Sequence, residues 1–273
     1  MRPALLLVGL AAAGAVPAAA QTPDVMFVPT NIDVALGMLR LAGVGDSDVV
    51  YDLGSGDGRL VIAAAKRYGA RGVGIDIDPS LVAEAARNAD TAGVTGRVGF
   101  RKADLFQTPL RDATVVTLYL TPSLNLRLRP KLLEELRPGA RVVSNNFDMG
   151  EWEPDSMIVV QGVAMANTPV RMWVIPAAVG GTWRITADGL PPVRVRLDQQ
   201  FQRASGKARI EGRGSASSEV RLIGDSLTLT IAGGNLPQPL RYVGRVKGAK
   251  AAGMVERPGG GAPRPWQAVR IGH

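Results

Sequence analysis

The chain has 273 residues, among them 32 Lys and Arg, 24 Asp and Glu, one His and no Cys, and its formal net charge is +8. This length suits one large domain or two smaller ones with a buried core. The lack of cysteine excludes disulfides, thiolate nucleophiles and cysteine-based zinc sites. Because the one histidine is His273, the sequence also argues against a Ser/His/Asp triad and a multi-histidine metal site. We therefore expect no metal site.

Residues 1–20 have the pattern of a signal peptide. Arg2 precedes an apolar run from Ala4 to Val16, and Pro17 and three alanines follow it. A positive start, a short apolar run and small residues before a cleavage point are typical of a secretory signal. We expect an exported protein, periplasmic or secreted, with cleavage after Ala20. An uncleaved segment that anchors the protein to a membrane is the alternative.

From residue 21 to residue 176, short β-branched runs alternate with longer helical stretches. Strands are predicted at 49–53, 72–76, 98–100, 113–120 and 141–147, and helices at 60–66, 80–91 and 124–136. Strands that alternate with helices predict a parallel sheet with both faces covered. We therefore expect a doubly wound α/β domain over residues 21–176.

After Pro176 the pattern changes to short alternating runs separated by Gly, Pro, Asp and Ser. Eight strands are predicted, at 182–186, 192–197, 207–211, 218–223, 226–231, 240–246, 253–256 and 266–271. Short strands without a helical period predict a small antiparallel barrel or sandwich over residues 177–273. Trp183 and Trp266 are expected in its core, with substrate docking as the alternative.

The basic excess lies in this C-terminal part of the chain. Residues 177–273 hold 15 Lys and Arg against 6 Asp and Glu, so the rest of the chain is nearly neutral. The basic residues are spread over predicted strands without interleaved aromatics, which argues against nucleic acid as a partner. A solvated basic surface is the first interpretation, and a face that binds an acidic partner is the second.

A glycine-rich turn follows the first predicted strand. The segment from Asp52 to Arg59 reads DLGSGDGR, with glycines at 54, 56 and 58. An open α/β sheet binds its ligand beyond the carboxyl ends of its strands, and glycine lets the backbone come close to that ligand. The spacing differs from the G-x-G-x-x-G of dinucleotide sites, and the Lys-Ser or Lys-Thr pair of a P-loop does not follow.

Three acidic residues lie at or just after the ends of three consecutive predicted strands. Asp52 is suited to accept a hydrogen bond from a cationic amino group, Asp76 from two ribose hydroxyls and Asp104 from an adenine amino group. Helix capping or a turn is the structural alternative for each of them. An amino-acid head, a ribose and an adenine in this order describe S-adenosylmethionine, which we expect as the cofactor.

These segments also resemble a known family. The glycine loop, Gly74–Pro79, Ala103–Phe106 and Tyr119–Pro122 resemble the motifs of class I, seven-strand S-adenosylmethionine-dependent methyltransferases. More narrowly, Phe27–Thr30, the Gly-Asp-Gly-Arg loop, Asp104-Leu105-Phe106 and the segment 128–132 are similar to the protein-lysine methyltransferase family that includes the mitochondrial enzyme acting on the ATP synthase c-subunit. The resemblance covers residues 25–176 and implies a Rossmann-like domain there, with a protein that carries an accessible lysine as partner.

The resemblance also implies site residues. Those implied to contact the cofactor are Pro29, Thr30, Asp52, Gly54, Ser55, Gly56, Asp76, Asp104 and Leu120. Tyr119, Thr121 and Asn125 are implied to face the acceptor and to align it for an in-line displacement. Two departures from the family pattern bear on acceptor choice: Phe27 replaces a common Tyr, and the segment 144–147 lacks a frequent His.

Export and this cofactor conflict, because S-adenosylmethionine is made in the cytosol. The alternative to a methyltransferase is therefore an exported, non-catalytic binding protein on a methyltransferase scaffold. The C-terminal β domain would then serve as its interaction module.

Overall fold

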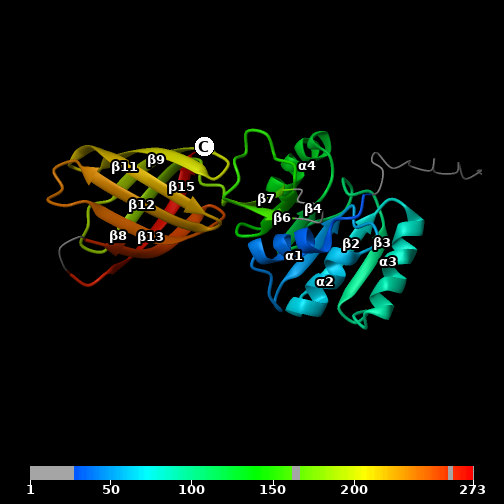
Figure 1. The fold of residues 1–273 in the computed structure, drawn as a ribbon. Helices are drawn as coiled ribbons and strands as arrows, with labels where there is room; N and C mark the ends of the chain where they lie inside the picture. The colour runs from blue at the N-terminus through cyan, green and yellow to red at the C-terminus, as the bar shows by residue number, and fades with distance from the viewer. Residues whose placement is uncertain (1–27, 162–166, 258–260, 273) are drawn as a thin grey trace, which may run out of the picture.

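The computed structural model describes residues 28–161, 167–257 and 261–272. They form a seven-stranded sheet flanked by helices and a closed eight-stranded barrel, which lie side by side in Figure 1. The predicted signal, residues 1–20, and Phe27 lie outside the described residues. Within the described part of the chain, no helix is long and apolar enough to cross a membrane.

The N-terminal sheet has mixed topology. Its strands are β1 Val49–Leu53, β2 Arg71–Asp76, β3 Val98–Lys102, β4 Val115–Leu118, β5 Arg141–Asn145, β6 Ser156–Gln161 and β7 Asn167–Val174. They are ordered β3-β2-β1-β4-β5-β7-β6, and β7 runs antiparallel to both of its neighbours while the other pairs are parallel. The strand order reverses between β1 and β4, and doubly wound sheets bind ligands at such a switch point.

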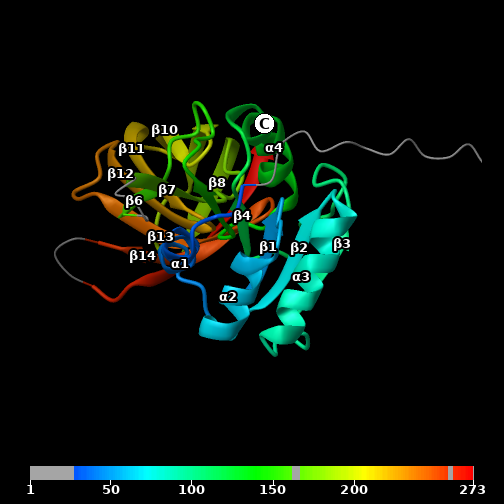
Figure 2. The same ribbon diagram turned by 45° about the vertical axis from the view of Figure 1, so that its right-hand side comes forward.

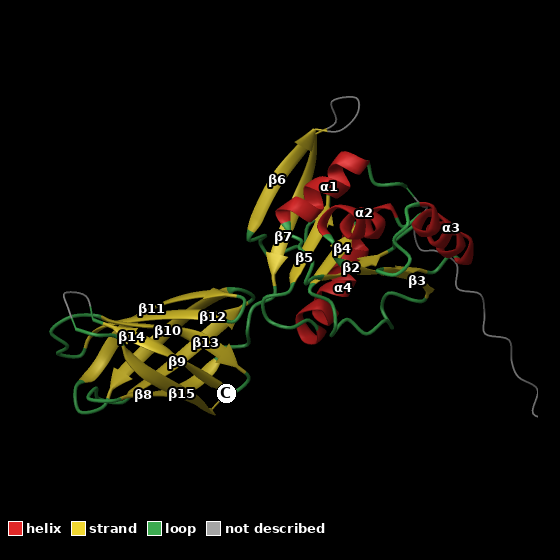
Figure 3. Cartoon of the chain, turned by 90° about the horizontal axis from the view of Figure 1, so that it is seen from below, coloured by secondary structure: helices red, strands yellow, loops and turns green. Residues whose placement is uncertain are grey.

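Helices cover both faces of this sheet. The helices α1 Ile32–Leu41, α2 Arg59–Tyr68 and α3 Pro79–Thr91 lie on one face, and α4 Pro122–Glu135 lies on the other (Figures 2 and 3). The buried residues Leu124, Leu128 and Leu132 recur every four positions and so form one apolar stripe of α4. This stripe packs in one core cluster with Val116 and Leu118 of β4.

The doubly wound α/β fold is confirmed, but three of its elements were not predicted. The prediction lacked α1 and the antiparallel hairpin of β6 and β7. β6 is the edge strand, so Ile158 and Val160 pack with α1 while Met157 and Val159 stay exposed. An apolar run that is half exposed does not give the alternation of apolar and polar residues from which strands are predicted.

The C-terminal part is a closed antiparallel barrel, which decides between the two predicted architectures. Its order is β10-β11-β12-β13-β14-β15-β8-β9, and each of the eight predicted strands is present. Trp183, Tyr242 and Trp266 are buried inside it. The strands are β8 Gly181–Ala187, β9 Val193–Gln200, β10 Arg203–Ile210, β11 Gly214–Ile223, β12 Ser226–Gly233, β13 Leu240–Lys247, β14 Lys250–Glu256 and β15 Arg264–Gly272.

A short linker, residues 175–180, connects β7 to β8. Its apolar residues Ile175, Ala177 and Val179 are buried, so the linker packs against both parts of the chain. The predicted division after Pro176 falls in this linker and stays a prediction of where each domain begins and ends.

Candidate active site

The loop between β1 and α2 turns through left-handed glycines. The φ angles of Gly54, Gly56 and Gly58 are 82°, 51° and 78°, which residues with a Cβ rarely adopt. The backbone N–H groups of Gly54 and Ser55 both donate to the carbonyl of Ile75, at 2.8 and 2.9 Å. The loop therefore folds over the end of β2 and presents its backbone at the switch point of the sheet.

Close packing beneath the loop requires a further glycine in β2. A Cβ on Gly74 would lie 2.4 Å from the Phe100 ring of β3 and 2.7 Å from Ser55 Oγ. Ser55 Oγ is itself buried, and it has no hydrogen-bond partner among the described residues. A buried hydroxyl without a partner beside bare backbone is a feature expected of a ligand site.

The carboxylates of Asp76 and Asp104 hold the turns at the ends of β2 and β3. Asp76 accepts from the backbone N–H groups of Gly56 and Asp78, at 2.8 and 3.0 Å, and Asp104 accepts from Phe106 N at 2.8 Å. The turn role given as the structural alternative is thus present for both. A carboxylate oxygen has two lone pairs, so these bonds leave capacity for a ligand. The predicted cofactor roles of both residues stay predictions.

Asp52 is the buried acid of the site. Thr117 of β4 donates its hydroxyl to Asp52 Oδ1 at 2.7 Å. Burial and, to a smaller extent, the carboxylates of Asp76 and Asp57 raise the pKa of Asp52, while the Thr117 bond opposes this rise. The net result is a pKa of about 7. A cationic group of a ligand would favour the ionised form of this acid.

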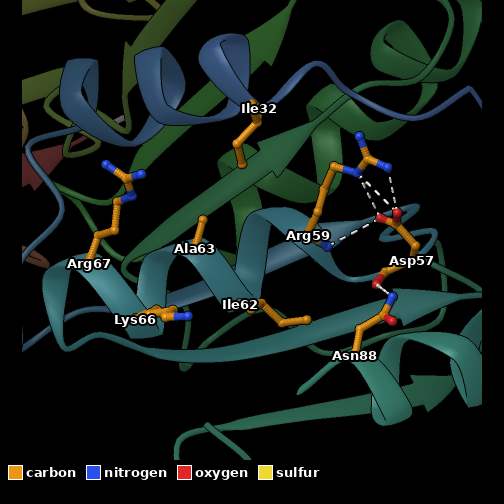
Figure 4. A pocket seen from close by; sticks show the side chains of 8 residues that line it. All are labelled: Ile32, Asp57, Arg59, Ile62, Ala63, Lys66, Arg67 and Asn88. Atoms are coloured by element: carbon orange, nitrogen blue, oxygen red, sulfur yellow. Dashed lines mark hydrogen bonds and ion pairs between the residues drawn. The ribbon is translucent and has the colours of Figure 1, made fainter. Parts of the chain in front are cut away.

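Arg59 fixes the segment that precedes α1. Its guanidinium binds both carboxylate oxygens of Asp57, at 2.6 to 3.0 Å, as Figure 4 shows, and it donates to the carbonyl of Thr30 at 2.8 Å. Thr30 is half-buried and Pro29 is exposed, and this bond holds both next to the glycine loop. Arg59 was not predicted as a site residue, although the Asp-Gly-Arg sequence was a usable signal.

The shallow hollow in Figure 4 shares only Arg59 and its partner Asp57 with this site. It lies on the outer side of α2 and is lined by Ile32, Asp57, Arg59, Ile62, Ala63, Lys66, Arg67 and Asn88. None of the predicted cofactor residues lines it. We therefore do not assign the cofactor to this hollow.

Two of the predicted acceptor-side residues and Leu120 lie directly after β4. The half-buried Tyr119 ring stacks on Phe147, with ring centroids 6.4 Å apart and planes inclined by 16°. Leu120 is buried, and a Cβ on Gly54 would lie 3.0 Å from its side chain. Thr121 is the N-cap of α4 and accepts from Leu124 N at 3.3 Å. The end of β4 thus meets the glycine loop.

Asn125 of α4 is fully buried rather than open to solvent. Its Nδ2 donates to Ser144 Oγ at 3.1 Å and to the carbonyl of Asp148 at 3.2 Å, while its Oδ1 has no partner among the described residues. Asn145, at the end of β5, was not among the predicted site residues. It is likewise buried, and its Oδ1 has no hydrogen-bond partner among the described residues. The polar run after β5 was a usable signal for it.

The donor set fits S-adenosylmethionine. Bare loop backbone, an unpartnered Ser55 hydroxyl and carboxylates at the ends of β1, β2 and β3 match its amino group, its ribose and its base. No phosphate-binding lysine follows the loop. Fold and site together define a class I S-adenosylmethionine-dependent methyltransferase.

Comparison with known proteins gives the family. Residues 52–156 match the family model of the ANTKMT methyltransferase domain. The chain is 43% identical over 154 residues to a protein-lysine N-methyltransferase of Saccharolobus islandicus, a match that covers 56% of this chain and 95% of that protein. The chain therefore belongs to the methyltransferase family that this domain defines.

Other similar proteins match over about half of the chain. The adenine nucleotide translocase lysine N-methyltransferase of Mus musculus is 36% identical over 52% of this chain, and the ATP synthase c-subunit lysine N-methyltransferase of Homo sapiens is 35% identical over 47%. The matches span only 61% and 54% of those two proteins. A crystal structure of an RNA methyltransferase from Salinibacter ruber with S-adenosyl-L-homocysteine is 54% identical, with a TM-score of 0.53, over 56% of this chain and 96% of that one.

Proposed function

We propose that this methyltransferase transfers its methyl group to a lysine side chain of a protein. The observation that carries the proposal is the match to the Saccharolobus islandicus protein-lysine N-methyltransferase, which covers 95% of that protein. The mouse and human relatives are likewise named as lysine methyltransferases. The proposal assigns to this chain the acceptor class that the names of these three relatives state.

The side chains near the end of β4 suit such an acceptor. The stacked rings of Tyr119 and Phe147 offer flat aromatic surface to an alkyl chain that ends in an ammonium group. The free Oδ1 of Asn125 is an acceptor for an N–H group. We further propose that Thr121 acts by capping α4 and so holding Asn125 in place.

These residues position the acceptor and do not form a charged acid–base pair. When bound, S-adenosylmethionine supplies a methyl group on a positively charged sulfur, which needs no protein acid to leave. A lysine acceptor has to lose a proton, and an apolar, aromatic surrounding lowers the pKa of its amine. Alignment and exclusion of water are therefore the expected contributions of this chain.

The test is methyl transfer from labelled S-adenosylmethionine to a bacterial extract by the purified full chain. Protease should release the label from the macromolecular fraction, and ribonuclease should leave it there. Because the Salinibacter ruber protein is titled an RNA methyltransferase, label removed by ribonuclease is the outcome that contradicts a protein acceptor. Heat-inactivated protein is the control.

The non-catalytic alternative is not favoured by the family match. It predicts that the protein does not bind S-adenosylhomocysteine, whereas a methyltransferase binds this product. A calorimetric titration distinguishes the two, because an absence of binding heat would support the alternative.

We also propose that residues 1–20 direct export. The support is the pattern of Arg2, an apolar run and alanines before Gln21. N-terminal sequencing of the protein isolated from its cells tests this. A chain that begins at Gln21 agrees with cleavage, and a chain that begins at Met1 contradicts it.

Basic residues gather on the outer face of β8, β9 and β10, and this supports the proposal of an acidic partner. Arg184, Arg194 and Arg209 are register neighbours across these strands, as are Arg196 and Lys207. Two of them form long ion pairs, Arg184 with Glu211 and Arg196 with Asp198, each at 3.9 Å. Like charges that face each other across strands cost stability.

We propose that the acceptor protein presents an acidic surface to this basic face. Replacing Arg194, Arg196 and Lys207 by Glu should then weaken methylation of protein in the extract and leave the affinity for S-adenosylhomocysteine unchanged. The matched control replaces Arg241 and Arg245 of β13, which are already paired with Glu256 and Asp225 at 2.7 and 2.6 Å. Equal loss of methylation in both variants would contradict the proposal.

A further inference from the structure

The tip of the barrel hairpin formed by β9 and β10 contacts the methyltransferase domain. Phe201, in the turn between β9 and β10, stacks on Trp152 with ring centroids 5.8 Å apart and planes inclined by 19°. The guanidinium carbon of Arg129 lies 5.3 Å from the centre of the same ring. Gln202, the next residue, donates its side-chain N–H to the carbonyl of Glu153 at 2.7 Å.

The turn is held in a conformation that suits this contact. Phe201 has a φ of 53°, in the left-handed region that bulky side chains rarely occupy. Gln199 donates to the carbonyls of Phe201 and Ala177, at 2.7 and 2.9 Å. Its Oε1 accepts from the linker N–H groups of Val179 and Gly180. One side chain thus fixes both the turn and the linker.

The segment 146–153 connects this contact to the acceptor side of the active site. We call it the acceptor wall. At its centre, Arg129 donates to the carbonyl of Met149 at 2.7 Å and Asn125 donates to that of Asp148 at 3.2 Å. At its start, Phe147 stacks on Tyr119. The barrel tip at one end and the Tyr119 ring at the other thus contact the same short segment.

From these contacts we infer that Phe201 is a positioning residue of the methyltransferase. Its ring, delivered by the barrel, fixes Trp152 and Arg129, and these hold the acceptor wall so that Phe147 lies against Tyr119. The inference rests on the proposed function, because it takes Tyr119 and Phe147 as the surface that receives the acceptor. It gives the barrel a part in acceptor binding and no part in cofactor binding.

The barrel contact is a feature of this chain that the family match does not include. The family model ends at residue 156, and the match to the Saccharolobus islandicus relative covers 95% of that protein. That relative therefore has no counterpart to the barrel. Phe201 and Gln202 would add a support for the acceptor wall that the shared domain alone lacks.

Phe201→Gly tests the inference, because glycine keeps a left-handed turn while the ring is removed. The matched control is Asn235→Gly, at the other left-handed non-glycine residue of the described barrel, with a φ of 55°. Hydrogen exchange followed by mass spectrometry reports on the acceptor wall directly. Loss of the ring contacts should speed exchange there by about three- to tenfold, and Asn235→Gly should not.

The activity assay adds a readout that a general loss of stability would not give. The probe is total protein of the extract with labelled S-adenosylmethionine. Phe201→Gly should raise the extract concentration needed for half-maximal labelling by a similar factor and leave the Kd for S-adenosylhomocysteine unchanged. The variant Phe201→Tyr, which keeps an aromatic ring, should show the exchange rate of the wild type. It should also need the same extract concentration as the wild type for half-maximal labelling.

Three results would overturn the inference. These are wild-type exchange in the acceptor wall of Phe201→Gly, an equal weakening of S-adenosylhomocysteine binding, and faster exchange without any change in labelling. If the wild-type protein labels no protein at all, the proposed function fails. The exchange comparison then still decides whether Phe201 holds the acceptor wall.

Discussion

Thr117 donates its hydroxyl to Asp52 Oδ1 at 2.7 Å, and both side chains are buried between the neighbouring strands β4 and β1. This bond opposes the effect of burial, which raises the pKa of Asp52 to about 7. The acid therefore titrates near neutral pH, at the strand end where the amino group of the cofactor is expected.

Cofactor affinity should depend on pH through Asp52. Protonation below about pH 7 removes the negative charge, so affinity for S-adenosylhomocysteine should fall about tenfold per pH unit below that value. Thr117→Val removes a bond that lowers the pKa and should move the midpoint to higher pH. Calorimetry over a range of about one and a half pH units on either side of the midpoint measures this. Asp52→Asn should abolish the dependence, and an unchanged curve in that variant would contradict the assignment.

The same acid should make the free protein less stable as the pH rises. The folded pKa of about 7 exceeds the ordinary value of 3.8, so between these values the native state holds more protons than the unfolded state. The free energy of unfolding then falls as pH rises through this window, by a total on the order of 4 kcal/mol. At pH values above the folded pKa of about 7, Asp52→Asn should raise Tm relative to the wild type. At pH values near the ordinary pKa of 3.8, it should have little effect on Tm. Thermal unfolding without cofactor checks this, and parallel pH curves for the two proteins would be inconsistent with it.

Asp76→Ala should abolish measurable binding of S-adenosylhomocysteine. The variant loses the predicted ribose contacts and also the bond to Gly56 N, so a loss of roughly a hundredfold or more is expected. Asp78→Ala is the matched control, because Asp78 caps α3 by accepting from Ser80 N at 2.8 Å. That control should cost about 1 kcal/mol of stability and leave affinity intact. Retained affinity in Asp76→Ala would refute the ribose role.

A methyl group at position 74 should disturb the glycine loop from below. Gly74→Ala would bring a Cβ within 2.4 Å of the Phe100 ring and 2.7 Å of Ser55 Oγ, which we expect to cost about 1–3 kcal/mol. Gly99→Ala in the adjacent strand is the control, because a Cβ there would meet nothing within 4 Å. Thermal unfolding and S-adenosylhomocysteine titration of both variants measure the effect. The packing argument fails if both variants behave alike.

The barrel and the glycine loop could be predicted because their signals are local. In β9, buried Val193, Val195 and Leu197 alternate with exposed Arg194 and Arg196, so the period of a strand is visible in the sequence. The loop is recognisable from its glycine spacing alone. A pattern within a few residues is enough for both.

The rest of the site depends on partners far away in the sequence. Arg59 reaches the carbonyl of Thr30, 29 positions earlier, and Phe201 reaches Trp152 in the other domain. That Asn125 faces the acceptor stays a prediction, and the structure adds that the side chain is buried and that its amide N–H group binds Ser144 and Asp148. No local pattern shows such contacts, so the support behind the acceptor side became visible only in the structure.

The most direct test of the proposed function is the chemical identity of the methylated residue. Extract protein labelled by the purified chain is hydrolysed completely to amino acids and analysed by chromatography with mass spectrometry. We predict that the label is found in ε-N-methylated lysine, and that Asp76→Ala transfers none. Label in a methylated nucleoside, or in an amino acid other than lysine, would contradict the account.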